Sequence, residues 1–542
     1  MGPKSQWVVM AYVIESPRCF RGRLAPLLIP MALILGTGCS SSKDDADAEG
    51  LDSGAQGSGY GTGGVGDGDG DGDDGWNDDG NGEGGDGTGG APGDDGGEDG
   101  APLPEDPEFE EPPEECNDAE EVTLYLSPDD SNSMSSPVQA REAILSNFSN
   151  LSEIGLRTWE FLNYYSFDYA PPAESGDVAL HADLLRIDED GEYVLQIGVA
   201  SEQIADEDRD NIAITLVLDT SGSMQGHAMD MLKETCHAIA AGLKEGDKVS
   251  MVTWTTENAT VLGGYTVNSP NDPMVVDKCD SLEAGGGTDL HGGLTSGYAL
   301  AEDTFSAGMI NRIVLISDGG ANAGITDVEI IADHAGGNDE DGIYMVAVGV
   351  GTASQYNDDL MDVVSDAGKG ASVFINSSEE AYKIFDEGFV NTMSVAARNV
   401  QVRLDMPPGF EVVRFSGEEI SEDPAEVDPQ HLSPNDAMVF HTHIETCAPD
   451  LVTPETEFTV TATYSDAKTF EVREIAQTFT FGEMVDADHS LLLKGAAVFE
   501  YAEALKGESS TLEAAETALS AGMEANPEDA DLAEIETVLN AL

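Results

Sequence analysis

The fold is decided by one stretch of the sequence, Ile212-Ala213-Ile214-Thr215-Leu216-Val217-Leu218-Asp219-Thr220-Ser221-Gly222-Ser223-Met224. Its first part, residues 212–218, is apolar apart from one threonine, which is typical of a strand that is covered on both faces. Asp219, Ser221 and Ser223 follow at alternate positions, so in an extended loop their oxygen atoms can face one point. The stretch therefore predicts a buried strand that ends in a cluster of oxygen donors.

Outward from this stretch, strand patterns alternate with helix patterns. Further buried strands are predicted at Lys248–Trp254, Arg312–Ile316 and Ile343–Val350. Helices are predicted at Gly226–Leu243, Leu290–Thr304, Thr326–Ala335 and Asp358–Ala367. The alternation indicates an α/β domain at residues 206–395, in which helices cover both faces of a mostly parallel sheet. Ligands of such domains bind in the loops at the carboxyl ends of the strands.

Two other loops of this domain also carry oxygen donors. Gly285-Gly286-Gly287-Thr288-Asp289 leads into a predicted helix, and Ser317-Asp318-Gly319 directly follows a predicted strand. Together the three loops supply five candidate metal ligands: Asp219, Ser221, Ser223, Thr288 and Asp318. Oxygen donors without His or Cys favour Mg²⁺, with Mn²⁺ or Ca²⁺ as alternatives, over Zn²⁺. Two carboxylates would leave the metal able to accept a further carboxylate from outside the protein.

In this order, the three motifs resemble the metal-ion-dependent adhesion site of von Willebrand factor type A (VWA) domains. The resemblance covers residues 211–395. It implies a Rossmann-like fold in which the two serines and the threonine bind a divalent metal directly, while the two aspartates act partly through water. It also implies a protein partner that presents an Asp or Glu carboxylate to the metal.

The regions around the α/β domain are predicted to form one β-sandwich that the domain interrupts. Strand patterns precede the domain at Asp177–Ile187 and Glu192–Ala200. Others follow it at Asn399–Met406, Phe410–Phe415, Ala437–Glu445, Glu457–Tyr464 and Glu471–Phe481. Two strands are marginal alone, whereas this larger set can bury a shared face between two sheets.

This interpretation divides the rest of the chain into three parts. We expect an N-terminal extension with a helix and the first sandwich strands at 116–205, and the remaining sandwich strands at 396–484. C-terminal helices are expected at 485–542, the last of them beginning at Asn526-Pro527. Within the extension, Arg157–Ser166 is similar to the segment upstream of the VWA domain in a family of bacterial VWA lipoproteins.

The amino-terminal residues 1–39 have the pattern of an export signal. An apolar run at Leu24–Leu35 follows the early basic residues, and it is too short to span a bilayer as a helix. Leu35–Ser42 resembles the lipobox of bacterial lipoproteins, although its large residue stands four places before Cys39 instead of three. The resemblance implies acylation of Cys39 and, because Ser40 follows it, an outer-membrane destination. The alternative is a buried core helix.

Residues 40–115 are predicted to be a disordered acidic linker. The 73 positions from 43 to 115 hold 25 acidic residues and one lysine among Gly/Asp repeats, with few apolar residues to bury. Asp67, Asp69 and Asp71 resemble the start of a calcium loop, but the closing twelfth position is Asp78 and not Glu. A solvated linker is the preferred interpretation.

The charge of the whole chain excludes some partners. Lys and Arg number 23 against 105 Asp and Glu, a formal net charge of −82. Nucleic acids and anionic lipid surfaces need a basic footprint, so neither is expected to bind. The acidic surface is compatible with divalent cations and with basic partners.

Enzymatic activity is not expected. Ser221 and Ser223 lack the Gly-x-Ser-x-Gly elbow of serine hydrolases, and His227 is expected to be an ordinary residue on the first turn of the next helix. His441 and His443 are expected to be ordinary sheet residues and not a zinc pair. A metal-dependent hydrolase remains the weakest of the alternatives.

Four cysteines remain after the signal and Cys39. Cys236 is expected in a helix and Cys279 in the segment before Gly285, so a disulfide between these two is feasible, with two buried free thiols as the alternative. Four cysteines allow three connectivities, and the sequence does not choose among them.

The leading hypothesis for function is a lipid-anchored protein of the cell envelope, periplasmic or surface-exposed. It would bind a divalent metal at the adhesion site and use it to bind a partner protein of unknown identity. The alternative is a structural envelope protein whose metal only stabilises the fold.

Overall fold

A computed structural model describes residues 116, 119–128, 132–146, 151, 154–188, 191–320, 342–507 and 510–542. The expected signal and lipidation site at 1–39, the linker at 40–115 and the helix expected at Thr326–Ala335 lie outside these residues. Within them, every helix is either too short or too polar to cross a bilayer.

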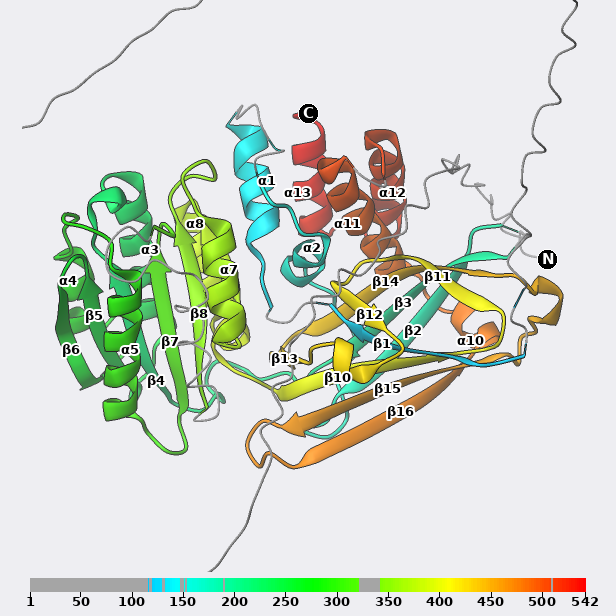
Figure 1. The fold of residues 1–542 in the computed structure, drawn as a ribbon, viewed down its shortest axis with the longest axis horizontal. Coiled ribbons are helices and arrows are strands. Elements are labelled where there is room, and N and C mark those ends of the chain that lie inside the picture. Colours follow the sequence, from blue (N-terminus) through cyan, green and yellow to red (C-terminus); the bar gives the residue numbers. More distant parts are fainter. Residues whose placement is uncertain are drawn as a thin grey trace, which may run out of the picture. The chain divides into compact units, whose positions relative to one another are not determined.

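The α/β domain is built on a six-stranded sheet with the order β6-β5-β4-β7-β8-β9 (Figure 1). Its strands are β4 (Ile212–Asp219), β5 (Lys248–Trp254), β6 (Asn258–Thr266), β7 (Ile310–Ser317), β8 (Ile343–Val350) and β9 (Ser372–Ile375). All neighbours are parallel except β5 and β6. The mostly parallel sheet expected from the sequence is confirmed, and the expected strands coincide with β4, β5, β7 and β8 to within two residues at each end.

Helices cover both faces of this sheet, which explains why β4 is apolar along its whole length. Val217 faces a core formed with α5 and α7, whereas Leu216 and Leu218 face a core formed with α3. The helices of the domain are α3 (His227–Gly242), α4 (Pro273–Asp280), α5 (Leu290–Thr304), α7 (Asp358–Ala367), α8 (Ser378–Tyr382), the π-helical turn Lys383–Glu387 and α9 (Phe389–Met393). The predicted boundaries of α5 and α7 are confirmed.

The flanking strands form a sandwich of two antiparallel sheets that share one core. The first sheet holds β12 (Glu419–Ser421), β1 (Val122–Ser127), β10 (Ala397–Met406), β15 (Glu457–Asp466) and β16 (Val472–Thr480), with β13 (Gln430–Leu432) also on β10. The second sheet has the order β11 (Phe410–Phe415), β14 (Ala437–Thr446), β3 (Glu192–Ala200) and β2 (Ala179–Arg186).

The α/β domain interrupts this sandwich, as the sequence predicts. Strand β3 precedes the domain and β14 follows it, yet the two pair along their whole length, with Val199 opposite Met438. Strands β1, β12 and β13 were not predicted. Strands β12 and β13 span only three residues each, too few to show a hydrophobic period. In β1, Val122, Leu124 and Leu126 do alternate with polar residues and face the sandwich core, so this strand could have been predicted.

Helices from both ends of the described chain complete the structure. They are α1 (Ser135–Leu145), α2 (Thr158–Tyr164), α10 (Phe481–Val485), α11 (Ser490–Lys506), α12 (Leu512–Ala525) and α13 (Ala530–Leu539). The rings of Phe161 on α2 and Tyr501 on α11 meet edge to face at 5.4 Å. The expected start of the last helix at Asn526 is wrong. Asp529 caps α13, while Asn526 ends α12 and donates from its side chain to Ser490 O.

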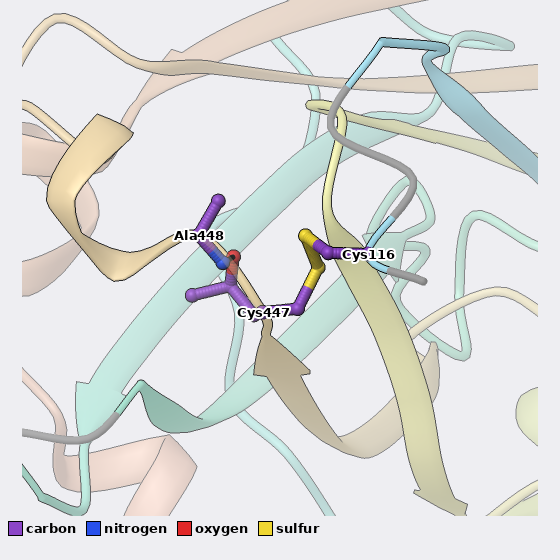
Figure 2. Close-up of a disulfide and its surroundings, with 4 residues drawn as sticks. Cys116, Cys447 and Ala448 are labelled. Carbon is purple, nitrogen blue, oxygen red and sulfur yellow. Dashed lines mark hydrogen bonds between the residues drawn. A yellow bond between two sulfur atoms is a disulfide. The ribbon is translucent and has the colours of Figure 1, made fainter. Parts of the chain in front are cut away.

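The cysteine pairing differs from the feasible Cys236–Cys279 bond. Cys236 and Cys279 are buried free thiols, which is the alternative interpretation, and a hydrogen bond joins them. The disulfide links Cys116 to Cys447 (Figure 2). Cys116 precedes β1 and Cys447 follows β14. The two residues are 331 positions apart in the sequence, and the pairing of strands within the sandwich brings them together. Only the tertiary fold brings the two residues together.

Candidate functional site

The three predicted ligand loops meet at the carboxyl edge of the α/β sheet. Asp219 is the last residue of β4, and the loop after it is joined to the glycine-rich loop by two backbone hydrogen bonds. Gly222 N donates to Gly286 O at 3.1 Å, and Gly285 N donates to Thr220 O at 2.8 Å. The first two motifs are therefore held side by side by their backbones.

The third motif is attached to the first through the carboxylate of Asp219. Ser317, at the end of the neighbouring strand β7, donates from Oγ to Asp219 Oδ2 at 2.7 Å. The backbone N–H of Ser221 donates to the other oxygen, Oδ1, at 2.8 Å. Ser317 is a residue of the site that the sequence analysis did not single out, although it begins the Ser-Asp-Gly motif. Its hydroxyl fixes the orientation of the buried aspartate.

The remaining side chains surround one point beside this aspartate. The backbone at position 320 marks it, because a Cβ atom added there would lie 3.2 Å from Asp318 Oδ1, 3.6 Å from Thr288 Cγ2 and 3.8 Å from Ser223 Oγ. Ser221 Oγ lies 2.9 Å from Ser223 Oγ. The structure thus brings all five predicted residues together. Ser223 is exposed, so the group opens to solvent.

The electrostatics of the site fit a hard cation. Asp219 is fully buried, and this burial raises the pKa of its carboxyl group to about 6, against the opposing effect of its hydrogen bonds from Ser317 and Ser221. Repulsion from the nearby carboxylate of Asp318, which is 9% exposed, raises the pKa of Asp219 further. A buried carboxylate is costly unless a cation or hydrogen bonds compensate for it.

The donors available define which metal the site would suit. In the part of the chain that the structure describes, no three His, Cys, Asp or Glu side chains gather to hold a metal. A metal here would therefore depend on the hydroxyl groups of Ser221, Ser223 and Thr288 as well as on two carboxylates. Such a set of hard oxygen ligands suits Mg²⁺ better than Zn²⁺.

The histidines occupy the ordinary positions predicted for them. His227 begins α3, and its Nε2 lies 3.1 Å from Asn376 O. His441 and His443 lie on β14, in the sandwich, and His441 Nδ1 is 2.9 Å from Gln196 Oε1. Burial lowers the pKa of His443 to about 3, so this imidazole is neutral at physiological pH.

A second group of residues, missed by the sequence analysis, supports the loop of Asp318 from behind. Asn357 N donates to Asp318 O at 3.3 Å, and its side-chain Nδ2 donates to Gly319 O at 3.1 Å. The next residue, Asp358, begins α7 and accepts a hydrogen bond of 2.8 Å from Gln139 on α1. The metal-site loop is thereby connected to the N-terminal extension.

Arg157 is the centre of that connection. Its guanidinium lies 2.5 Å from Asp358, 2.9 Å from Asp362 and 3.2 Å from Glu160. Glu160 is fully buried, and burial, aided by repulsion from Asp358, raises the pKa of its carboxyl group to about 8. Arg157 belongs to the segment that resembles the upstream region of VWA lipoproteins, and here it ties α2 to α7.

Comparisons with known proteins agree with this domain. The profile of the von Willebrand factor type A domain matches residues 213–387. The uncharacterized protein YfbK of Escherichia coli is 26% identical over 218 residues, which cover 40% of this chain and 37% of that protein. Inter-alpha-trypsin inhibitor heavy chain H2 of Mesocricetus auratus is 24% identical over 51% of this chain and 30% of that protein. The matches thus span only about a third of these relatives.

Solved structures include similar domains. A von Willebrand factor type A protein from Catenulispora acidiphila aligns with 68% of this chain and 91% of its own, at a TM-score of 0.42 and 15% identity. The profile match begins in β4 and ends directly before α9, so it contains the three loops described above. Residues 213–387 of this chain are therefore a von Willebrand factor type A domain.

Proposed function

We propose that the protein binds one divalent metal ion, Mg²⁺ above Mn²⁺ or Ca²⁺, and uses it to bind an acidic side chain of a partner protein. Ser221, Ser223 and Thr288 would hold the metal directly, and Asp219 and Asp318 would act partly through water. The observation that carries the proposal is the meeting of four oxygen-bearing side chains beside the buried carboxylate of Asp219, at a place open to solvent. VWA domains generally mediate metal-dependent adhesion or protein interaction, which agrees with it.

A binding role is favoured over a hydrolytic one by the contacts of the serines. The hydroxyls of Ser221 and Ser223 bond to each other, and the ring of His227 is engaged by Asn376 O. A serine nucleophile would instead need a base within hydrogen-bond reach. When bound, the metal would supply an electrophilic position for a carboxylate, and the protein's own part would be to orient Asp219 through Ser317.

The test is a peptide array probed with and without chelator. The wild-type protein with Mg²⁺ is expected to retain peptides that contain Asp or Glu, to lose them in EDTA, and to ignore the same peptides with Asn or Gln. Thr288→Ala should reduce retention at least about tenfold, on the scale of a lost ligand-supporting group. Thr295→Ala is the matched control, because Thr295 is an exposed hydroxyl on α5 away from the site.

Two outcomes would redirect the proposal. Peptide retention that is equal in Mg²⁺ and EDTA would contradict metal-dependent binding. A metal that raises the melting temperature without any acidic peptide being retained would favour the alternative, a structural protein stabilised by its metal.

We further propose that the protein is exported and anchored by a lipid at Cys39, in the outer membrane. The lipobox-like sequence supports this, and the Cys116–Cys447 disulfide is of the kind that persists in oxidising compartments. Cys39→Ala is expected to move the protein from the membrane fraction to the soluble fraction of fractionated cells. A variant that stays with the membrane would show that something other than the lipid holds it there.

A further inference from the structure

A small, partly enclosed cavity lies where the VWA domain meets the sandwich. Its volume is about 30 Å³, and its walls include Arg312 of β7, Lys369, the segment 391–395 that ends the VWA domain, and residues 430–433 around β13. A water-sized particle needs roughly 10–15 Å³ of such space, so the cavity holds about two of them. It lies away from the metal site, because Arg312 is near the amino end of β7 and Asp318 follows its carboxyl end.

The arginine in this wall is buried without a carboxylate. Arg312 is 4% exposed, its Nε donates to Met393 O at 2.9 Å, and its guanidinium lies 5.3 Å from the ring centre of Tyr344. Among the described residues, the charged group that acts on it is another cation, Arg398, stacked 4.9 Å from the same ring. Burial and this repulsion lower the pKa of Arg312 to about 9.

This arrangement is unusual within the same protein. The other deeply buried guanidinium, that of Arg209, is paired with Asp247 at 2.6 Å. In a chain with a net charge of −82, a carboxylate would be the ordinary partner. Arg312 instead has a second cation, Arg398, as its charged neighbour. Burial, together with Arg398, Arg312 and Lys369, lowers the pKa of the nearby His431 to about 3, so this ring is neutral.

The cavity also has hydrogen-bond donors without a protein partner. His431 is 7% exposed, and its Nδ1 accepts from Asn399 N at 3.1 Å, which places the ring proton on Nε2. His431 Nε2 and the hydroxyl of Ser394 are both buried and make no hydrogen bond within the described structure. The acid in the wall, Asp436, accepts from Ala437 N at 2.8 Å and forms no ion pair among the described residues. Asn391 Oδ1, an acceptor in the same wall, also makes no hydrogen bond within the described structure. The positive charges of Arg312 and Lys369, together with the two donors, nevertheless favour an anion over a neutral occupant.

We propose that the cavity binds one small monovalent inorganic anion of the size of chloride, held by Arg312, by the N–H of His431 and by the hydroxyl of Ser394. The volume excludes phosphate esters and other large anions. The anion joins β7 and the end of the VWA domain to β13 of the sandwich, since Arg312 and Ser394 come from the first and His431 from the second. The bound anion therefore stabilises the interface between the inserted VWA domain and the sandwich.

The test compares chloride with gluconate, an anion too large for the cavity, at equal ionic strength and on the full-length protein. Equal ionic strength is needed because the acidic protein responds to screening by any salt. At a tenfold excess over its dissociation constant, chloride is expected to raise the melting temperature of the wild type by about 2–4 °C, with saturation. Crystals grown in bromide are expected to show an anomalous peak between Arg312 and His431.

Variants separate binding from a general salt effect. Arg312→Met should abolish the difference between chloride and gluconate, and Ser394→Ala, a milder change that keeps the packing, should raise the chloride concentration needed several-fold. Arg403→Met, on the sandwich surface and paired with Asp405, should leave the chloride effect unchanged. Equal melting temperatures of the wild type in the two salts, or a cavity without bromide that contains only water, would overturn the proposal.

Discussion

Asp219→Ala is expected to lower the affinity of the VWA domain for Mg²⁺ by at least about tenfold, and to abolish metal-dependent retention of acidic peptides. The carboxylate of Asp219 is fully buried and is oriented from both sides, by Ser317 Oγ and by Ser221 N. Removing it takes one of two negative charges from the site and leaves the hydroxyl of Ser317 without its acceptor. Calorimetric titration of Mg²⁺ into the two proteins measures the change.

Asp219→Asn distinguishes charge from shape in this experiment. The amide keeps the size of the side chain but not its charge. The Mg²⁺ affinity of the asparagine variant should therefore fall nearly as much as that of the alanine variant. Asp230→Asn is the matched control, because Asp230 is exposed on the first turn of α3. Unchanged Mg²⁺ affinity in both Asp219 variants, or Zn²⁺ bound more tightly than Mg²⁺, would count against the all-oxygen site.

Arg157→Met is expected to destabilise the protein by about 3–5 kcal/mol, the range found when one partner of a buried ion pair is removed. Methionine keeps much of the length of the side chain, but it leaves Asp358 and Asp362 without their cation, and also Glu160 at a pH high enough to ionise it. Because Asp358 follows Asn357, which holds the loop of Asp318, we also expect Mg²⁺ affinity to fall several-fold. Urea unfolding measures the loss of stability, and titration with Mg²⁺ measures the loss of affinity. Both are carried out at a temperature at which the variant is still folded.

The pH dependence of this variant has a definite sign. The pKa of Glu160 is raised in the folded protein, from 4.5 to about 8, so its contribution to stability is fully present below about pH 4.5 and is lost as the pH rises through 8. Removing Arg157 takes away the cation that favours the charged form. The destabilisation should therefore be larger at pH 8 than at pH 5. A loss of stability that is the same at both pH values would show that the ionisation of Glu160 contributes nothing to the effect of Arg157.

Local patterns in the amino-acid sequence were enough to predict the VWA domain and the place of its candidate metal site. Strand β4 is almost entirely apolar because helices cover both its faces. Such a run can be recognised in the sequence without any knowledge of the fold. Asp219 and Asp318 follow adjacent parallel strands, and such strands end at the same edge of a sheet. Their meeting is therefore a consequence of local pattern and strand direction.

The insertion of the VWA domain into the sandwich was also predictable. The two strands that precede the domain in the sequence are too few to form a stable sheet alone, so they had to pair with the strands that follow it. The exposed strand β6 and the three-residue strand β12 were not predictable, since neither shows a regular alternation of apolar and polar residues. Strand β1 does show this alternation, at Val122, Leu124 and Leu126, and was missed all the same.

Several pairs of distant residues meet because of packing that no local pattern predicts. Cys116 pairs with Cys447 because pairing of β1 with β10 and of β11 with β14 brings both to one end of the sandwich. Arg157 meets Asp358 across 201 positions, and Arg312 has no carboxylate partner among the described residues because of what packs around it. A side chain's charge and polarity can be read from the sequence, but the partner that balances them depends on packing between elements that no local pattern records.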